Sequence, residues 1–266
     1  MNRAKVGSIH LAYSIKGEGD PLILIGGFGM VKEMWERQVA DLSRQFRVIV
    51  FDNRGIGDST VSEPGFTIAD MAADVVGLMD CLGVDKSHIF GISMGGLIAQ
   101  TLALDHGNRI RKAALGCTSH GGRFAVAPDA QVMSLLTKMN DPDIPMEEKI
   151  RLRLSIMYSK QFIREEPGEI GKMIAMSLRY QPTLKGVQGQ MKALSFFNVK
   201  KRLSEIRCPV LVITGDEDVM MPPENARLIA ESIPGAELYI VKGAGHGFFD
   251  EKPEEVNRVL AAFFNK

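Results

Sequence analysis

Ser93 occupies a sequence context that is typical of a nucleophile. An apolar run at 87–92 ends in the segment GISMG at 91–95, and a helical pattern begins immediately afterwards. So tight a turn between a strand and a helix forces the serine into strained backbone angles, and it needs small residues two positions before and after, which Gly91 and Gly95 supply. The pattern therefore predicts that the Ser93 hydroxyl lies at the carboxyl edge of a sheet, near the positive end of a helix.

A hydrolytic serine needs a general base, and the base needs an acid that orients it. His246 is the best candidate for the base, because it lies in a glycine-rich loop between the last apolar run and the last helical pattern. The acid should follow the preceding apolar run, where the chain offers Asp216, Glu217 and Asp218. Serine, acid and histidine thus occur in this order along the chain.

A second glycine turn, GGFG at 26–29, follows the apolar run at 22–25. Such a turn can cradle a phosphate, or it can direct a backbone N–H at a carbonyl oxygen that is becoming negative. The fingerprint G-x-G-x-x-G could start at Gly27 and Gly29, but its third glycine is replaced by Lys32, and no Gly-Lys-Ser/Thr follows. A position beside a reacting carbonyl is the better interpretation.

A few side chains near these segments are candidates for the substrate pocket. Each is also explained by ordinary packing, but together they favour an apolar substrate. The candidates are Met30, Trp35, His120, Met220 and Met221. The other histidines, His10, His88 and His106, are expected to be structural.

The elements that must position these residues alternate along the chain. Runs that are apolar throughout are typical of strands covered on both faces, as in a parallel sheet with crossover helices. They occur at 22–25, 47–51, 87–92, 110–115, 211–214 and 237–241. The first 19 residues alternate like a hairpin. A helix is predicted at 67–83, where Thr67 is a cap and Asp70 completes a capping box, and helices at 223–235 and 253–264 begin with proline.

The alternation stops between about 120 and 205, where the sequence is helical and free of strands. Helices are predicted at 129–139, 146–158, 168–180 and 186–197. We therefore expect a core domain formed by 1–119 and 206–266, with 120–205 inserted as a helical cap. Seven of the 15 methionines lie in this insertion; they could be ordinary packing or could line a pocket for varied apolar ligands.

The bulk composition excludes some classes of partner. The chain has 266 residues, 45% of them apolar, which is ample for a core. Lys plus Arg equals Asp plus Glu at 32 each, so nothing favours nucleic acid or an anionic membrane, and a small, neutral partner is expected. The three cysteines show no metal-binding spacing, and no apolar run reaches the ~18 residues of a membrane span. The expectation is a soluble, cytoplasmic protein.

Three motifs make the chain resemble an α/β-hydrolase with a helical cap. The segment FDNRGIGDS at 51–59 is similar to the D-x-R-G-x-G-x-S loop of that superfamily, and the order serine, acid, histidine is the superfamily's order. Its acid motif, G-x-x-D-x-x-x-P, fits Gly215, Asp218 and Pro222, which selects Asp218 and leaves Asp216 to cap a loop. Within the superfamily, GISMGGLIAQ is most similar to small carboxylesterases and 3-oxoadipate enol-lactonase-like hydrolases.

The resemblance implies a mostly parallel, eight-stranded sheet and a Ser93–His246–Asp218 triad that needs no metal or organic cofactor. The oxyanion would be bound by the backbone N–H groups of Phe28 and Met94. The expected reaction is hydrolysis of small to medium, largely apolar carboxylic esters. Enol-lactone hydrolysis, carbon–carbon bond hydrolysis and perhydrolysis remain alternatives, as does a ligand-binding receptor built on a hydrolase scaffold.

One position departs from the family pattern. Gly26 stands where relatives usually have a histidine that supports the glycine turn. Either the turn is looser here or another residue supports it. In the 51–59 loop, Asp52 and Arg54 are expected to form a structural pair.

Overall fold

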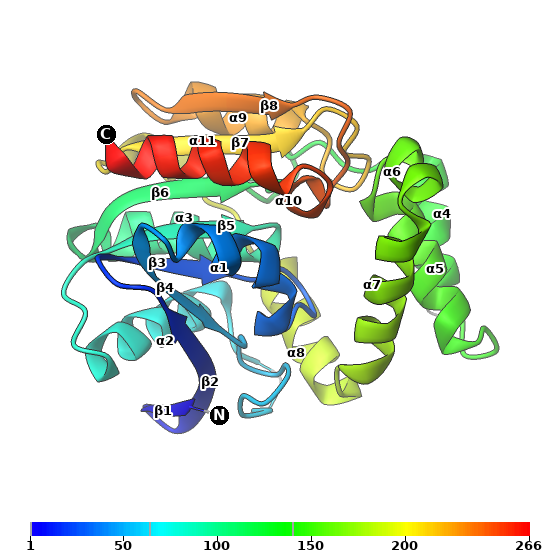
Figure 1. The fold of residues 1–266 in the computed structure, drawn as a ribbon, viewed down its shortest axis with the longest axis horizontal. Helices are drawn as coiled ribbons and strands as arrows, with labels where there is room; N and C mark the ends of the chain where they lie inside the picture. The colour runs from blue at the N-terminus through cyan, green and yellow to red at the C-terminus, as the bar shows by residue number, and fades with distance from the viewer. Residues whose placement is uncertain (1, 64, 140) are drawn as a thin grey trace.

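A single mixed sheet organises the computed structural model, which describes residues 2–63, 65–139 and 141–266. In the described chain its strands are β1 (Asn2–Val6), β2 (Ile9–Lys16), β3 (Asp20–Ile25), β4 (Phe46–Phe51), β5 (Ser87–Ile92), β6 (Ile110–Gly116), β7 (Val210–Gly215) and β8 (Glu237–Val241). Their order is β1-β2-β4-β3-β5-β6-β7-β8 (Figure 1). The β1–β2 and β2–β4 pairs are antiparallel and the others are parallel, which is the predicted α/β-hydrolase sheet.

Helices cover both faces of this sheet. One face packs against α2 (Ile68–Cys81), α3 (Met94–Asp105) and α9 (Glu224–Ser232), and the other against α1 (Glu36–Leu42), α10 (Phe248–Glu251) and α11 (Pro253–Asn265). Short 3₁₀ turns occur at η1 (Lys32–Trp35), η2 (Gly107–Arg109) and η3 (Lys200–Glu205). The predicted capping box starts α2, with Thr67 Oγ1 accepting from Asp70 N. Pro253 is inside the first turn of α11 as predicted, whereas Pro223 is the N-cap of α9.

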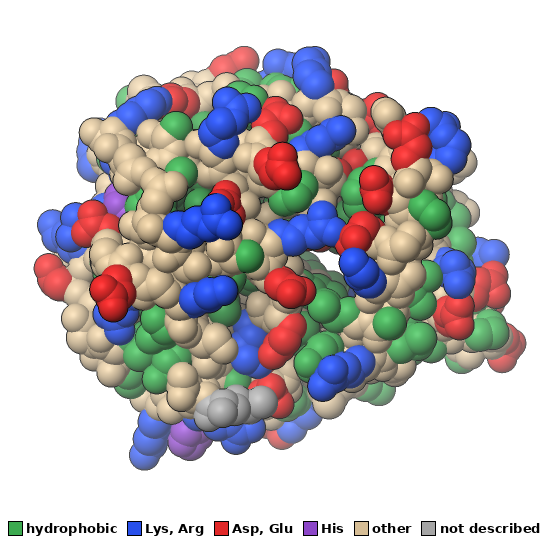
Figure 2. All heavy atoms as spheres, viewed as in Figure 1, with side chains coloured by type: hydrophobic (Ala, Val, Ile, Leu, Met, Phe, Trp, Pro, Cys, Tyr) green, Lys and Arg blue, Asp and Glu red, His purple; other side chains and the backbone are tan. Residues whose placement is uncertain are grey.

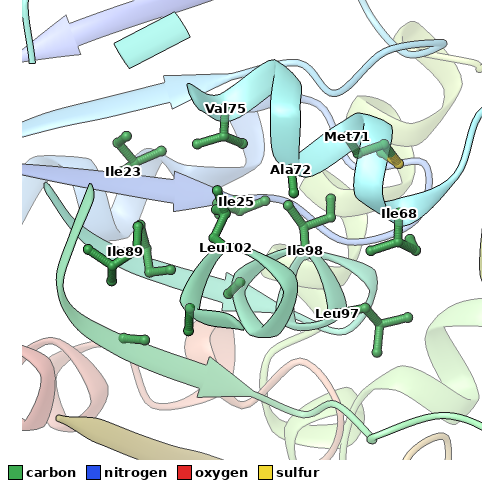
Figure 3. Close-up of a cluster of buried hydrophobic side chains, with 14 of the residues drawn as sticks. Ile23, Ile25, Ile68, Met71, Ala72, Val75, Ile89, Leu97, Ile98 and Leu102 are labelled. Carbon is green, nitrogen blue, oxygen red and sulfur yellow. The ribbon is translucent and has the colours of Figure 1, made fainter. Parts of the chain in front are cut away.

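The two covered faces explain why the strands are apolar throughout. Ile23, Ile25 and Ile89 point toward α2 and α3, where Val75 and Ile98 meet them (Figure 3). The alternate residues of the same strands, including Leu22, Leu24 and Phe90, belong to the cluster on the opposite face. Burial of each aliphatic side chain of this kind stabilises the folded state by about 1.5–3 kcal/mol. The strand that leads into Ser93, β5, is therefore held rigidly from both sides.

Between β6 and β7 the chain forms α4 (Ala130–Lys138), α5 (Met146–Met157), α6 (Lys160–Glu165), α7 (Pro167–Arg179) and α8 (Leu184–Ser195). Four of these helices were expected, and α6 is additional. Helices α4–α7 stand together beside the sheet-bearing part (Figure 1) and have a small core of their own, formed by Ile150, Leu154, Tyr158 and Ile174. The insertion closes at its base, where Gly121 and Asn198 form an isolated β-bridge. Across the described residues, no helix combines the length and apolarity that a membrane crossing requires.

Candidate active site

Ser93 lies in a strained turn between β5 and α3. Its backbone has φ 53° and ψ −118°, a conformation that L-residues adopt rarely. The turn is crowded: a Cβ at Gly91 would lie 2.1 Å from the carbonyl oxygen of Gly95, and a Cβ at Gly95 would lie 2.1 Å from that of Ile25. Glycine is therefore required at both positions, for the steric reason that the sequence pattern suggested.

His246 and Asp218 form a buried hydrogen-bonded pair. The Nδ1 of His246 lies 2.8 Å from Oδ2 of Asp218. The other carboxylate oxygen accepts backbone N–H bonds from Met220 at 2.9 Å and Met221 at 2.8 Å, which fix the orientation of the carboxylate. Burial alone would lower the pKa of His246, but the Asp218 carboxylate raises it well above its usual value. Because Nδ1 is held by Asp218, Nε2 is the ring nitrogen left to exchange a proton.

Asp216 does not join this pair. Its Oδ1 accepts the backbone N–H of Gly243 at 2.7 Å, and its Oδ2 lies 3.2 Å from Lys242 Nζ. It thus ties the loop after β7 to the loop after β8, as a loop-capping acid would.

Cys117 completes the buried surroundings of the pair, and sequence reasoning missed it. Its thiol is 1% exposed, and its Sγ lies within 4.8 Å of the nearest ligand-type atoms of Asp218 and His246. Burial raises the pKa of Cys117, so its thiol stays protonated at neutral pH. These three side chains are of types that bind metals, but the nitrogen and carboxylate oxygen are already bonded to each other, which favours a hydrogen-bonded cluster.

Ser93 and His246 border the same cavity, whose volume is about 330 Å³. Figure 2 shows the molecule hollowed between its sheet-bearing part and the inserted helices, with hydrophobic side chains inside the hollow. Methionines dominate the apolar wall: Met30, Met34, Met139, Met157, Met173, Met176 and Met220. Four of them come from the insertion, whereas Met133, Met146 and Met191 are exposed. The insertion therefore uses methionine both around the cavity and on its surface.

Two of the five proposed pocket residues, Met30 and Met220, border this cavity. The other three do not. Trp35 is fully buried, with Phe90 and Phe249 at ring-centroid distances of 5.5 and 5.4 Å, so it is a core residue. His120 is also fully buried and has its Nδ1 2.8 Å from the carbonyl oxygen of Gly121. Met221 contributes its backbone N–H to Asp218 and is not among the cavity-lining residues.

The backbone N–H groups of Phe28 and Met94 have the character expected of an oxyanion hole. Neither donates a hydrogen bond to any residue that the structure describes, although Met94 is only 1% exposed. The turn that carries Phe28 lies against the nucleophile, since a Cβ at Gly27 would be 3.3 Å from the Cβ of Ser93. Unpaired N–H groups in buried surroundings are rare unless something else accepts from them.

Two polar side chains support this turn in place of the usual histidine. Asn53 Nδ2 donates to the carbonyl oxygen of Gly26 at 2.9 Å. Gln190, on α8, accepts the N–H of Gly29 through Oε1 at 3.0 Å and donates through Nε2 to the carbonyl oxygen of Arg54 at 3.1 Å. The absence of the histidine at position 26 left two alternatives, a looser turn or support from another residue. The structure has the second, because other residues support the turn. No local pattern points to Gln190, which is 161 positions away from Gly29.

The expected pair of Asp52 and Arg54 is not present. Asp52 is fully buried and instead accepts from the backbone N–H of Lys32 at 2.7 Å and from its Nζ at 2.9 Å. Arg54 pairs with Asp74 on α2. The prediction was wrong because adjacency along a loop does not decide which charges meet: Lys32, just after the glycine turn, folds back onto the end of β4.

Ionisable side chains also border the cavity, another feature that sequence reasoning missed. Tyr158 donates its hydroxyl to Asp250 Oδ2 at 2.9 Å. Burial raises the pKa of Asp250 to about 7. Arg153, on α5, donates from Nη2 to Ser177 Oγ on α7 at 2.9 Å. The cavity therefore carries ionisable groups, from α10 as well as from the inserted segment, in a wall that is mainly apolar.

Comparisons with known proteins agree with this architecture. A family described as alpha/beta hydrolase fold matches residues 20–253. A Mycobacterium tuberculosis protein named "Putative non-heme bromoperoxidase BpoC" is 32% identical over 96% of this chain and 98% of its own. An enol-lactonase from Burkholderia xenovorans superposes with a TM-score of 0.88 at 27% identity, covering all of both chains. A thermophilic esterase from Thermogutta terrifontis superposes with a TM-score of 0.86 at 28% identity, covering 100% of this chain and 98% of its own.

Proposed function

The chain belongs to the α/β-hydrolase family, and on that premise we propose that it is a serine hydrolase that cleaves carboxylic esters through an acyl-enzyme on Ser93. The substrates would be small to medium esters with a largely apolar body. One observation carries the proposal: strained Ser93 and His246, which is hydrogen-bonded to buried Asp218, border one methionine-lined cavity. Residues 120–205 act as the cap over that cavity, and no metal or organic cofactor takes part.

Acylation begins when His246 Nε2 takes the proton of the Ser93 hydroxyl as Oγ attacks the ester carbonyl. Asp218 holds Nδ1–H and stabilises the imidazolium that forms. The carbonyl π electrons move onto oxygen, and the N–H groups of Phe28 and Met94 bind the oxyanion. Losing one such donor costs about 2.7–4 kcal/mol of transition-state stabilisation in comparable sites. The tetrahedral intermediate then expels the alkoxide, which takes the proton from His246 and leaves as the alcohol.

Deacylation repeats these steps with water. His246 takes a proton from a water molecule as the oxygen attacks the acyl carbonyl, and the same two N–H groups bind the second oxyanion. Expulsion of Ser93 Oγ, which regains the proton from His246, releases the carboxylic acid. All protons are exchanged through one histidine, so a single ionisation should govern both half-reactions.

Enol-lactone hydrolysis is the main alternative, and the likeness to the Burkholderia enol-lactonase supports it. A lactone is a cyclic ester, so the same atoms would act. Carbon–carbon bond hydrolysis and perhydrolysis also use a serine in this fold. A receptor that retains these residues is the alternative from another class, and it would bind ligand without turnover.

A panel of p-nitrophenyl esters of increasing acyl length, together with one enol-lactone, tests the proposal. Ser93→Ala is the blank, because it removes the nucleophile without adding volume to the turn. We expect turnover of the short and medium esters by the wild type and none above the blank by the variant. Turnover at the wild-type rate by Ser93→Ala would contradict the assignment of the nucleophile. Absence of turnover on every member would favour the other reactions or the receptor.

A further inference from the structure

Arg153 is a half-buried cation that borders the active-site cavity without a carboxylate partner. It extends from α5, where its neighbours Leu154 and Met157 also border the cavity. Its guanidinium donates from Nη2 to Ser177 Oγ at 2.9 Å. No described carboxylate oxygen lies within ion-pair distance of its guanidinium.

The other Lys and Arg side chains among the described residues bordering this cavity each have a carboxylate partner. Arg37 and Lys172 both pair with Glu169. The Nζ of Lys172 lies 2.8 Å from Oε1 of Glu169. Arg37 also donates to the backbone carbonyl of Asp250 at 3.0 Å. Among the described cavity-lining residues, Arg153 is thus the Lys or Arg side chain that has no carboxylate partner.

The acidic residues of the cavity have other partners or lie at the surface. Glu33 lies 2.9 Å from Lys32, Glu36 is exposed, and Glu169 serves two cations. Asp250 is held by the Tyr158 hydroxyl, and its raised pKa of about 7 keeps a large fraction of it neutral at neutral pH. The cavity is therefore left with a cationic position in a mainly methionine-lined wall.

An unpaired cation in partly desolvated surroundings is costly unless an anion joins it. Burial lowers the pKa of Arg153, yet a guanidinium stays protonated throughout the physiological range. Its planar group presents N–H donors as a fork that matches a carboxylate, and one of them, on Nη2, is engaged by Ser177 Oγ. The chemistry at this position is that of a carboxylate-binding site.

We propose that the substrate carries a carboxylate in addition to its scissile ester, and that Arg153 binds this carboxylate while the ester carbonyl lies at Ser93. The substrate class is then an acidic ester or lactone: a half-ester of a dicarboxylic acid, or an ester of a hydroxy acid. This inference rests on the proposed function and adds a specificity-determining residue to it. The methionines would contact the carbon chain between the two polar ends.

Two matched pairs of esters test the proposal. The first pair is mono-p-nitrophenyl glutarate and p-nitrophenyl butyrate, which places the carboxylate on the acyl side. The second is 4-butyryloxybenzoate and its methyl ester, which places it on the alcohol side. For each pair the measured quantity is the ratio of kcat/KM for the anionic ester to that for the neutral ester. The wild type should prefer the anionic member in at least one pair.

Arg153→Met should lower that ratio about tenfold or more, mainly through KM, because methionine fits the apolar wall but cannot bind the anion. Arg153→Lys should retain part of the preference, since it keeps the charge and loses the fork. Arg151→Met is the matched control: Arg151 lies on the same helix, is exposed and pairs with Glu147 one turn away. The control should leave the ratio unchanged.

An equal ratio in the wild type and Arg153→Met, with Ser93-dependent turnover of the neutral ester, would overturn the inference and leave the proposed function standing. If no ester is turned over at all, the proposed function fails, and calorimetry still decides the role of Arg153. Mono-p-nitrophenyl glutarate should bind the Ser93→Ala protein at least tenfold more tightly than the Ser93→Ala/Arg153→Met protein. Equal affinities would overturn the inference.

Discussion

Two carboxylates two positions apart, Asp216 and Asp218, have different environments at the residue scale. Asp218 is buried against His246, whereas Asp216 is bonded to a loop amide and to an exposed lysine. The account predicts that Asp218→Asn lowers kcat by about 10⁴, because the imidazole loses the partner that fixes its tautomer. Asp216→Asn should have a small effect on kcat. Steady-state kinetics on one p-nitrophenyl ester compares them, and a larger loss for Asp216→Asn would show that the wrong acid was chosen.

The ionisation of His246 sets a second prediction at this scale. Only neutral imidazole can accept the Ser93 proton, so kcat/KM should rise with pH as His246 loses its proton. Since Asp218 raises the pKa of His246, the midpoint of that rise should lie above the ordinary histidine value of 6.5. A profile of kcat/KM for a neutral ester between about pH 5 and pH 9 measures it. A midpoint below 6.5, or a flat profile, would contradict the proposed base.

At the scale of elements, the insertion and the core meet at the glycine turn. Gln190 of α8 holds the N–H of Gly29, next to the proposed oxyanion donor Phe28. Asn53, after β4, holds the other end of the turn. We therefore propose that α8 positions this donor for the reaction through Gln190, with no need for a side chain of α8 to touch the substrate.

Gln190→Ala should therefore lower kcat by about tenfold to a hundredfold with little change in KM, because misplacement of a donor by about 1 Å is enough for such a loss. Gln188→Ala is the matched control, since Gln188 is an exposed glutamine on the same helix. Kinetics on one ester, together with the melting temperature of each variant, separates positioning from folding. A fall in melting temperature with kcat unchanged would mean that Gln190 only stabilises the fold.

Local sequence patterns predicted the helices, strands and turns well where the interaction that determines the structure lies within one stretch of sequence. The continuous apolar strands reflect a sheet that is covered on both faces, and Gly91 and Gly95 reflect a collision that occurs within the turn itself. The contacts that span the chain were not predictable in this way. The hydrogen bonds of Gln190 with Gly29 and of Lys32 with Asp52 depend on how separate segments pack. A single sequence carries no signal of that packing.

At the scale of the whole molecule, the cavity is lined both by the sheet-bearing part and by the segment between β6 and β7. The sheet supplies Ser93, His246 and Asp218 at the ends of its strands, which fits the general placement of sites in α/β folds. The segment between β6 and β7 supplies four of the methionines and Arg153 to the wall of the cavity. Sequence reasoning assigned Trp35 and His120 to this cavity because each follows a site segment, but burial assigns both to the core.

The central claim is that the reaction passes through an acyl-enzyme on Ser93, and rapid-quench mass spectrometry tests it most directly. The protein is mixed with excess p-nitrophenyl butyrate, quenched in acid during the first turnovers and digested. We expect a butyryl group on the peptide that contains Ser93, with an amplitude that follows the release of p-nitrophenol. A butyryl group on another residue, such as Cys117, or rapid turnover with no acylated peptide, would rule out an acyl-enzyme on Ser93.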